Sequence, residues 1–542
     1  MSTPEQSERR HSPWLVLSVL CLGFFMILLD TTIVNIAVPA MSDKLHASLS
    51  DILWILNAYI LVYAVLLITA GRLGDLYGPK QLFTVGLVIF TAASVACGFA
   101  QDPTQLIVFR IIQGLGGALL TPQTLSVITV IFPPERRGAA FGVWGGVAGI
   151  ATLAGPLLGG WLVTDFGWRW IFFVNVPVGI VALVGAAIVM PNLKLNRRHR
   201  LDWLGTLLAT ASLFLITFGL IEGQPHDWGK VWGPITIVEI IVAGAALLAV
   251  FFAQQWAGRD GEPLVPFQIF RDRNFSVMNY VVGSIAFGML GLFLPLTIFL
   301  QSVLGLSALQ AGLTTAPMSL ISMFVAPLAG RYADKTGGKS VLFVGLTLFS
   351  AGMGILIASS HEDVSRWHLL PGLIVAGFGL GMTFAPLQTV AMRNVEPRMA
   401  GAASGLINTT RQLGGVIGSA AIGALLQAQL TDKLKAAAIT QTASLPPAQR
   451  QEFLSRFGTS AANLDVGNSA GGTTFPPGTR PQFVSLATGI FHTGFVNAMR
   501  VTLWLPIAVL AVGAISVLLV RNRGRSPQAT PTDTVEAPAA AH

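Results

Sequence analysis

Long apolar runs, separated by short segments rich in Gly, Pro and charge, make up most of this chain of 542 residues. An apolar run of about 20 residues can cross the hydrocarbon core of a bilayer as a helix. The pattern predicts fourteen such helices, so the predicted fold class is an all-α membrane protein. The predicted helices are 14–40, 50–70, 82–101, 104–132, 139–163, 170–190, 203–222, 234–256, 275–303, 310–329, 341–360, 368–392, 401–428 and 494–520.

An internal repeat relates the two ends of this pattern. The repeated segments are 71–75 with 330–334, 135–142 with 397–405, and 117–122 with 381–386. Their offsets are nearly constant (330 − 71 = 259 and 386 − 122 = 264), which pairs the first six helices with the last six. The seventh and eighth helices are left as an insert. Two parallel six-helix halves around a midplane site are a transporter architecture.

These patterns divide the chain into five parts. Segment 429–490 is predicted to be a loop because it contains Gly- and Pro-rich sequence, and the last residues are Pro-, Ala- and Thr-rich, which is typical of disorder. The parts are a cytoplasmic N-terminus 1–13, an N-terminal six-helix bundle 14–190, two inserted helices 203–256, a C-terminal six-helix bundle 275–520 with the extracytoplasmic loop 429–490, and a disordered cytoplasmic tail 521–542.

Composition narrows the class of protein. Hydrophobic residues make up 53% of the chain and charged residues 11%, and the mean hydropathy is +0.67. A soluble domain carries about 25% charged residues, so we exclude a soluble enzyme and expect the lipid bilayer as a partner. The net charge is +8. Because the basic residues lie in short groups between apolar runs and form no stripe, a nucleic acid is not an expected partner.

The distribution of Lys and Arg predicts the orientation, since these residues concentrate in cytoplasmic loops of membrane proteins. If the N-terminus is cytoplasmic, the short loops on the outer side hold only Lys44, Arg169, Lys230 and Arg366. Both termini are therefore predicted to be cytoplasmic, and an even number of helices agrees with this.

Four of the charged residues within the predicted helices are candidates for a functional site, because an ionisable side chain there is costly and marks such a site by default. Asp30 and Glu239 are the carboxylates, and Arg110 and Arg411 are the bases. A carboxylate that is shielded from water binds a proton more readily, so Asp30 is the candidate proton carrier. Arg110 keeps its charge and needs a partner, for which Asp30 is the natural choice.

Each of these assignments has a structural alternative. Asp30 could lie in water at the mouth of the bundle, and Arg110 could bond backbone carbonyls. Arg411 could face a cavity or a neighbouring helix, and Glu239 could face the other helix of the insert. The candidates for the wall of a substrate cavity are Trp54, Tyr59, Trp144 and Met289.

The motifs that contain these residues, in their order along the chain, resemble the fourteen-spanning drug:proton antiporters of the major facilitator superfamily. The resemblance covers residues 14–520. In this family the Arg of the fourth-helix motif is linked to proton transfer, which implies that role for Arg110 beside Asp30. The matching segments are 29–39 in the first helix, 71–80 between the second and third helices, 110–118 in the fourth, 155–160 in the fifth and 167–179 before the sixth.

The fifth-helix segment, with Gly155, Pro156, Gly159 and Gly160, resembles the motif that marks exporters of this superfamily. Glycines at a spacing of four let helices approach closely, and a proline bends the helix. The flanking sequence departs from the family pattern, because Ala151 stands where Gly is usual.

The segment between the second and third helices resembles the loop signature of the superfamily, in which an Asp and basic residues form a charge cluster that latches the cytoplasmic side in one state. Leu76 and Pro79 replace the usual arginines, so the latch could be weakened. The alternative is a tight turn that only carries positive charge. The residues concerned are Gly71, Arg72, Asp75, Gly78 and Lys80, with Asp334, Lys335 and Lys339 in the second copy.

The resemblance implies a major facilitator fold, with two six-helix halves plus two extra central helices. It also implies a proton-coupled antiporter that exports small amphipathic or cationic drugs or antibiotics across the cytoplasmic membrane of a bacterium by alternating access. The expected partners are a small-molecule substrate and protons, the expected state is a monomer, and the proton gradient replaces any cofactor. No metal is expected, because the eight histidines include no pair at metal-ligand spacing.

Other functions stay open. Dedicated export of one metabolite or antibiotic made by the same cell is the main alternative to a multidrug exporter. An importer, a membrane receptor that does not transport and a polytopic membrane enzyme are weaker alternatives. The enzyme would need histidines or carboxylates clustered at one membrane depth, and the sequence shows no such cluster.

Overall fold

The structure is a computed structural model that describes residues 12–47, 49–193, 202–223, 226, 228–257, 267–396, 399–443, 450 and 481–521. The predictions made for segment 1–13 before residue 12, for the tail beyond residue 521 and for the middle of loop 429–490 lie outside the described residues.

The first half is helical throughout its described residues. Pro79, Pro103 and Pro134 begin three of its helices, at the position where the missing N–H of proline has no intrahelical partner to lose. The elements are α1 (Pro13–Leu45), α2 (Leu49–Tyr77), α3 (Pro79–Phe99), α4 (Pro103–Ile131), α5 (Pro134–Asp165), α6 (Trp170–Phe173) and α7 (Asn175–Val189).

The insert and the second half follow. The insert consists of α8 (Trp203–Glu222), a hairpin of β1 (Lys230–Trp232) and β2 (Ile235–Thr236), and α9 (Ile237–Ala257). The second half consists of α10 (Gln268–Arg271), α11 (Arg273–Ile298) with a π-helical turn (Phe299–Val303), α12 (Ala308–Thr336), α13 (Lys339–Ser359), a 3-10 turn (Arg366–Leu369), α14 (Leu370–Gly381), α15 (Phe384–Ala391), α16 (Ala400–Gln441), α18 (Pro481–Thr502) and α19 (Trp504–Val517).

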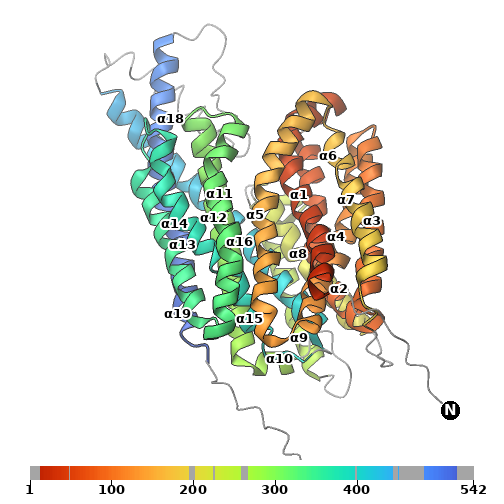
Figure 1. Ribbon diagram of the computed structural model, residues 1–542. Helices are drawn as coiled ribbons and strands as arrows, with labels where there is room; N and C mark the ends of the chain where they lie inside the picture. Colours follow the sequence, from red (N-terminus) through yellow and green to blue (C-terminus); the bar gives the residue numbers. More distant parts are fainter. Residues whose placement is uncertain are drawn as a thin grey trace, which may run out of the picture.

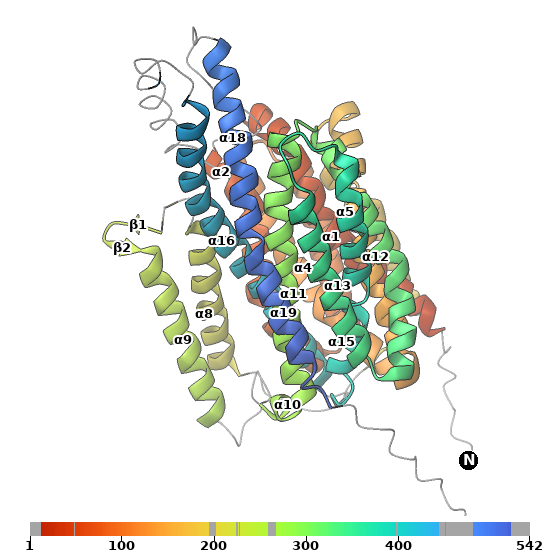
Figure 2. The ribbon, with the colours of Figure 1, turned by 90° about the vertical axis from the view of Figure 1, so that its left-hand side faces the viewer.

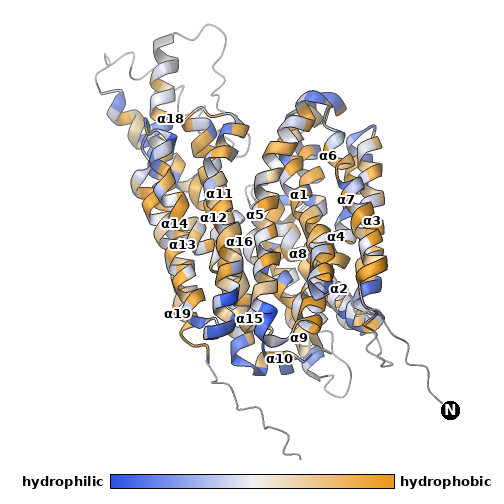
Figure 3. Ribbon diagram, viewed as in Figure 1, coloured by the Kyte–Doolittle hydropathy of each residue, from blue (hydrophilic) through white to orange (hydrophobic). Residues whose placement is uncertain are grey.

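The prediction of an all-helical membrane protein is confirmed. Among the described residues, thirteen stretches are long and apolar enough to cross a membrane. The glycine-rich α5 is not among them, but it lies between α1 and α12 and accounts for the fourteenth predicted span. Apolar residues dominate the middle of the bundle and hydrophilic residues gather toward its ends (Figure 3).

The helices form two bundles that stand side by side (Figure 1). In the first, α4 packs on α2 and α3, and α1 packs on α5 and α7; in the second, α16 packs on α11 and α18, and α13 packs on α14 and α19. The halves meet where α5 packs on α12 and α2 packs on α16. We call the end at which α1 begins and α19 ends the terminal end; toward the opposite end the ribbons of the two halves diverge (Figure 1).

The insert lies beside the interface of the two halves. Its first helix, α8, packs on α9 and also contacts α2 of the first half and α16 of the second. The second helix, α9, stands on the outside of the bundle (Figure 2). Among the described residues, α8 is thus the helix of the insert that packs on both halves.

Helices extend into both ends of the predicted loop 429–490, so the predicted bounds of the loop are too wide. Helix α16 has 42 residues, which corresponds to about 63 Å at 1.5 Å per residue, about twice the hydrocarbon thickness of a bilayer. It continues to Gln441, and α18 already begins at Pro481. The two extensions pack on each other, and the side-chain amide of Gln441 donates a hydrogen bond to the Thr493 hydroxyl (2.8 Å). Apolar packing between paired helices replaces the predicted loop there.

Glycines allow the two halves to touch at the terminal end. A Cβ atom placed on Gly330 of α12 would lie 2.0 Å from the carbonyl oxygen of Gly138 in α5. A Cβ atom on Gly71 of α2 would lie 2.4 Å from the carbonyl oxygen of Gly401 in α16. These separations are shorter than any real Cβ contact, so a larger residue at either position forces two backbones apart.

We therefore expect Gly330→Ala to separate the halves at the terminal end, because the backbone of α5 has to move. Overpacking of this kind costs about 1–3 kcal/mol. A reporter Ala402→Cys, on the other interhalf contact and buried, should react several-fold faster with a maleimide in a background without Cys21 and Cys97. The control is Gly354→Ala in α13, where an added Cβ meets no atom within 4 Å. Equal reactivity in the two variants would contradict the expectation.

Candidate functional site

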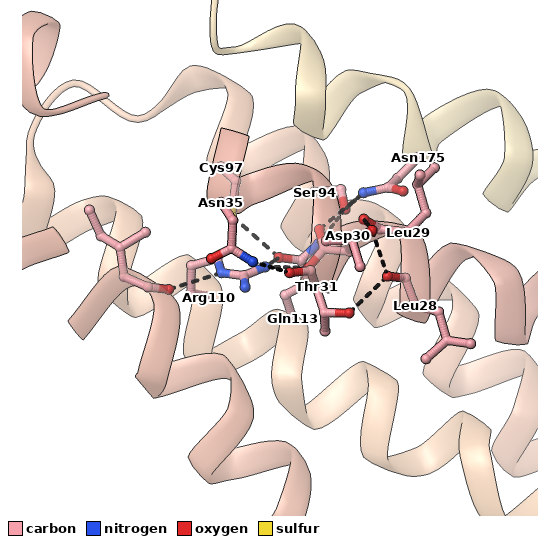
Figure 4. Close-up of polar contacts among 12 residues, drawn as sticks. Leu28, Leu29, Asp30, Thr31, Asn35, Ser94, Cys97, Arg110, Gln113 and Asn175 are labelled. Carbon is pink, nitrogen blue, oxygen red and sulfur yellow. Dashed lines mark hydrogen bonds and ion pairs between the residues drawn. The ribbon is translucent and has the colours of Figure 1, made fainter. Parts of the chain in front are cut away.

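A buried ion pair joins α1 to α4. The Nη1 atom of Arg110 donates a hydrogen bond to Oδ2 of Asp30. Asp30 is 0% exposed and Arg110 is 1% exposed. The prediction that these two residues are partners is confirmed, and the alternative that Asp30 lies in water at the mouth of the bundle is wrong (Figure 4).

Three neutral side chains complete the surroundings of Asp30. Its Oδ1 atom accepts hydrogen bonds from the side-chain amides of Gln113 (2.9 Å) and Asn175 (3.2 Å). The same two amides also donate to the Ser94 hydroxyl oxygen, at 2.7 and 3.4 Å. Figure 4 shows these side chains, from α3, α4 and α7, converging on Asp30 of α1. All four helices belong to the first half.

Arg110 has further partners that do not depend on Asp30. Its Nε atom donates to the carbonyl oxygen of Ile55 in α2 (3.1 Å), and its Nη1 atom also donates to Oε1 of Gln113 (2.8 Å). The guanidinium carbon lies 4.3 Å from the centre of the Tyr59 ring. The proposed alternative, an Arg bonded to backbone carbonyls, thus describes part of the same arrangement.

Ser94, Gln113 and Asn175 were missed as members of the site. Gln113 and Asn175 lie in segments that were recognised only as motifs, and Ser94 lies in an apolar helix without any motif. The available signal was polarity inside an apolar run, because a buried polar side chain needs a partner. Helical periodicity alone cannot say that side chains from three different helices meet at one carboxylate.

Glu239 does not belong to this site. It is exposed in the first turn of α9, where its Oε2 atom accepts a hydrogen bond from the backbone N–H of Thr236 (2.7 Å). The backbone N–H of Glu239 in turn donates to the Thr236 hydroxyl (3.3 Å). This reciprocal pair is a capping box. The prediction of a buried membrane carboxylate is therefore wrong, since the Thr-x-x-Glu spacing marks a helix start.

Arg411 lies on the opposite half. It is half-buried in α16, and its guanidinium carbon is 6.0 Å from the centre of the Phe24 ring in α1. It therefore faces the first half. Of the predicted cavity residues, Tyr59 lies against Arg110 and Trp144 stacks on Phe24, whereas Trp54 packs on Phe218 of the insert.

Helix α5 changes its partner along its length. Near its start, a Cβ atom on Gly142 would lie 2.6 Å from the carbonyl oxygen of Ala326 in α12, in the other half. Further along, Gly155 and Gly159 meet Thr32 and Ile33 of α1, in the same half. A Cβ atom on Gly160 would meet nothing within 4 Å. Close packing therefore explains Gly155 and Gly159 of the motif but not Gly160.

Ala151, where the family pattern has Gly, fits this packing. Its side chain is buried, and its carbonyl oxygen accepts a hydrogen bond from the Thr32 hydroxyl of α1 (3.3 Å). The departure from the family pattern therefore leaves the contact between α1 and α5 in place.

Two aspartates tie the halves together at the terminal end. Asp75, in the last turn of α2, accepts hydrogen bonds from the backbone N–H groups of Gly401 and Ala402 at the start of α16, both at 2.9 Å. Asp334, near the end of α12, accepts equivalent bonds from Gly138 (2.7 Å) and Ala139 (3.1 Å) of α5. At the start of α16 the carboxylate satisfies N–H groups that have no intrahelical acceptor, and at both helix starts it interacts favourably with the helix dipole.

The predicted charge cluster therefore has a different composition. Lys80 donates to the carbonyl oxygens of Ala187 (3.1 Å) and Met190 (2.7 Å) at the end of α7, within its own half. Lys339 donates in the same way to Leu518 (2.7 Å) and Val520 (3.0 Å) after α19. Cations suit helix C-termini. These two lysines hold each half together, and the aspartates join the halves.

The other members of the loop signature have local roles. Gly78 has φ +95° in the turn between α2 and α3, a backbone conformation that favours glycine. Arg72 is buried, and Lys335 is exposed. Both copies of the signature thus place an aspartate at the interhalf contact and, five residues later, a lysine that bonds carbonyl oxygens at the end of another helix.

The sequence of this chain is similar to those of known membrane transporters. The profile of the Major Facilitator Superfamily matches residues 20–419. An uncharacterised MFS-type transporter of Mycobacterium tuberculosis is 42% identical over 78% of this chain and 72% of its own length. The tetracenomycin C resistance and export protein of Streptomyces glaucescens is 34% identical over 95% of this chain and 93% of its own. Proteins named multidrug resistance proteins are also among the relatives.

The solved structures show the fold. One of them is a major facilitator superfamily proton:xylose symporter, whose match covers 94% of this chain and 95% of the symporter chain, with a TM-score of 0.57 and 14% sequence identity. At this identity the likeness concerns the arrangement of the helices alone. The predicted architecture of two six-helix halves with an insert is consistent with it.

We expect the double variant Asp75→Asn, Asp334→Asn to loosen the terminal end, since each aspartate contributes about 1 kcal/mol or more as a charged helix cap. Spin labels replace Tyr77 of α2 and Tyr332 of α12, which are both exposed. Pulsed electron paramagnetic resonance then measures the distance between the two labels, and hence the separation of the halves. The distance distribution should shift to longer values.

The matched control is Asp102→Asn, because Asp102 caps α4 within one half by accepting from the N–H of Gln105 (2.8 Å). That variant should leave the distribution unchanged. A double variant that behaves like this control would show that the two aspartates do not hold the halves together.

Proposed function

The chain belongs to the Major Facilitator Superfamily and is a membrane transporter, and we propose that it is a proton-coupled antiporter that exports small amphipathic organic molecules by alternating access. The buried ion pair of Asp30 and Arg110 is the observation that carries this proposal. Asp30 is 0% exposed. Burial of a carboxylate inside a membrane bundle costs free energy, which makes Asp30 a candidate functional residue.

The surroundings of the pair suit a group that gains and loses a proton. When Asp30 is protonated, the attraction between it and Arg110 is lost. Arg110 then keeps the carbonyl oxygen of Ile55 and Oε1 of Gln113 as acceptors, so the buried cation is not left without partners. When Asp30 is ionised, the amides of Gln113 and Asn175 donate to it again. Both protonation states are thus supplied with hydrogen bonds.

The interhalf contacts support alternating access. The structure is closed at the terminal end, where the glycine contacts and the Asp75 and Asp334 caps lie. Opening this end breaks the four bonds from backbone N–H groups to the two carboxylates. Because these bonds are made between halves and the lysine bonds are made within halves, each half can move as a unit.

The relatives support export of organic compounds. One relative that spans nearly the whole chain is named for resistance to and export of tetracenomycin C, and others are named for multidrug resistance. The first name favours a second candidate function, the dedicated export of a single compound. A narrow range of exported compounds in susceptibility assays would distinguish it from multidrug export.

We further propose that the terminal end faces the cytoplasm, as the distribution of Lys and Arg predicts. The long extension of α16 then lies outside the cell. The proposal also includes a monomeric transporter that needs no cofactor other than the proton gradient.

We expect Asp30→Asn to abolish uphill export while leaving exchange intact. In proteoliposomes, the wild type should accumulate or expel a fluorescent amphipathic dye against its gradient when a pH gradient is imposed, and lose this activity on addition of an uncoupler. The variant should respond to neither, yet still exchange dye for dye at equilibrium, because neutral Asn cannot carry the proton. A purely structural role for Asp30 would remove exchange as well.

The matched control is Asp43→Asn, on the same helix but with a side chain that is 76% exposed. It should retain export. Proton-driven export that persists in Asp30→Asn would place the coupling site elsewhere.

The orientation is checked by labelling intact cells with a membrane-impermeant maleimide, in a background without Cys21 and Cys97. Lys435→Cys, exposed on the extension of α16, should be labelled. Tyr77→Cys, exposed at the terminal end, should be labelled only after the cells are permeabilised. The reverse pattern would invert the proposed orientation.

A further inference from the structure

Arg411 continues the face of α16 that contacts the first half. Ser404 of α16 donates a hydrogen bond from its hydroxyl to the carbonyl oxygen of Pro122 in α4 (2.8 Å), which places this face against the first half. Seven residues make almost two turns of an α-helix, so Arg411 lies on the same face of α16 as Ser404, about two turns farther from the terminal end. Its contact with the Phe24 ring at 6.0 Å agrees with that direction.

Arg411 differs from Arg110 in its partners. Arg110 is paired with Asp30 and bonded to Ile55 and Gln113. Within the described residues, the Arg411 guanidinium has no carboxylate at ion-pair distance and no hydrogen bond. It faces the aromatic ring of Phe24. The oxygens of Asp30 are already occupied. An unpaired cation at this depth is costly and marks a pathway for substrate or ions.

An aromatic surface lies beside this cation. The ring of Phe24 stacks on Trp144 of α5, with ring centres 4.2 Å apart and planes inclined by 17°. Trp144 is 1% exposed, and its indole N–H has no acceptor in the part of the chain that the structure describes. A buried N–H without an acceptor is uncommon and calls for an explanation. Phe24 is also 1% exposed, so a ligand can reach these rings only when the helices around them move apart. The region then combines aromatic surface with two donors that lack acceptors, the Arg411 guanidinium and the Trp144 indole N–H.

We propose that Arg411, Phe24 and Trp144 form a subsite for an anionic aromatic substrate. The guanidinium would bind a carboxylate, sulfonate or phenolate group, and the aromatic body of the substrate would lie against Phe24 and Trp144. The proposal rests on the proposed export function and names its substrate class. Because Arg110 neutralises Asp30, the unpaired charge at the interface of the halves is positive, which disfavours the cationic drugs expected from the sequence.

The test compares three ligands of one shape on the purified full-length protein in detergent: 2-naphthoate, its neutral amide 2-naphthamide, and the cation 2-naphthylmethylammonium. Calorimetry measures each dissociation constant. The wild type should bind naphthoate most tightly, and Arg411→Gln should weaken naphthoate binding at least about tenfold, as expected for a lost bond to a charged group. Binding of the amide should change less than about twofold, and Arg411→Lys should keep part of the preference for the anion.

Three outcomes would overturn the subsite: equal binding of naphthoate and its amide by the wild type, an unchanged naphthoate affinity in Arg411→Gln, or no binding of any of the three ligands. An unchanged melting temperature of Arg411→Gln excludes misfolding as the cause of a loss. Equilibrium binding needs no proton gradient, so this test separates the subsite from the export function. If naphthoate binding depends on Arg411 but the protein shows no proton-driven transport, the proposed export function is overturned and the subsite is not.

Discussion

Two opposite charges buried in a membrane bundle depend on each other, because removal of either one leaves the other without compensation in a medium that solvates it poorly. In this protein the charges are those of Asp30 and Arg110. Satisfying them requires amide groups from α4 and α7 and a carbonyl from α2, so the pair fixes how the helices of the first half pack around it. The same dependence makes the pair responsive to a single proton.

The two halves are joined in a way that repeats the symmetry of the sequence. Asp75 caps α16, and Asp334 caps α5, at positions related by nearly the same offsets (334 − 75 = 259 and 401 − 138 = 263). Both contacts use backbone N–H groups at helix starts, and both need glycine so that the backbones can approach. These bonds join the halves only at the helix starts, so they break together when the halves part.

The symmetry does not extend to the charges inside the bundle. The first half contains a neutralised pair, and the second half contributes the unpaired cation Arg411 across the interface. In the proposed mechanism the proton therefore binds within the first half, whereas the substrate binds between the halves, on Phe24 and Trp144 of the first and Arg411 of the second. Coupling between them then depends on the relative movement of α1 and α16, since Phe24 and Asp30 lie on the same helix and Arg411 lies on the other.

The sequence by itself determined the spans, the repeat, the family resemblance and the partnership of Asp30 with Arg110. Each of these follows from local hydropathy, from spacing, or from the rule that a buried charge needs an opposite one. Only the tertiary structure decided that Ser94, Gln113 and Asn175 surround Asp30, that Glu239 is a helix cap, and that aspartates rather than lysines join the halves. The physical reason is that these outcomes depend on which helix faces which, and the packing of helices far apart in the chain is not encoded in the periodicity of any one of them.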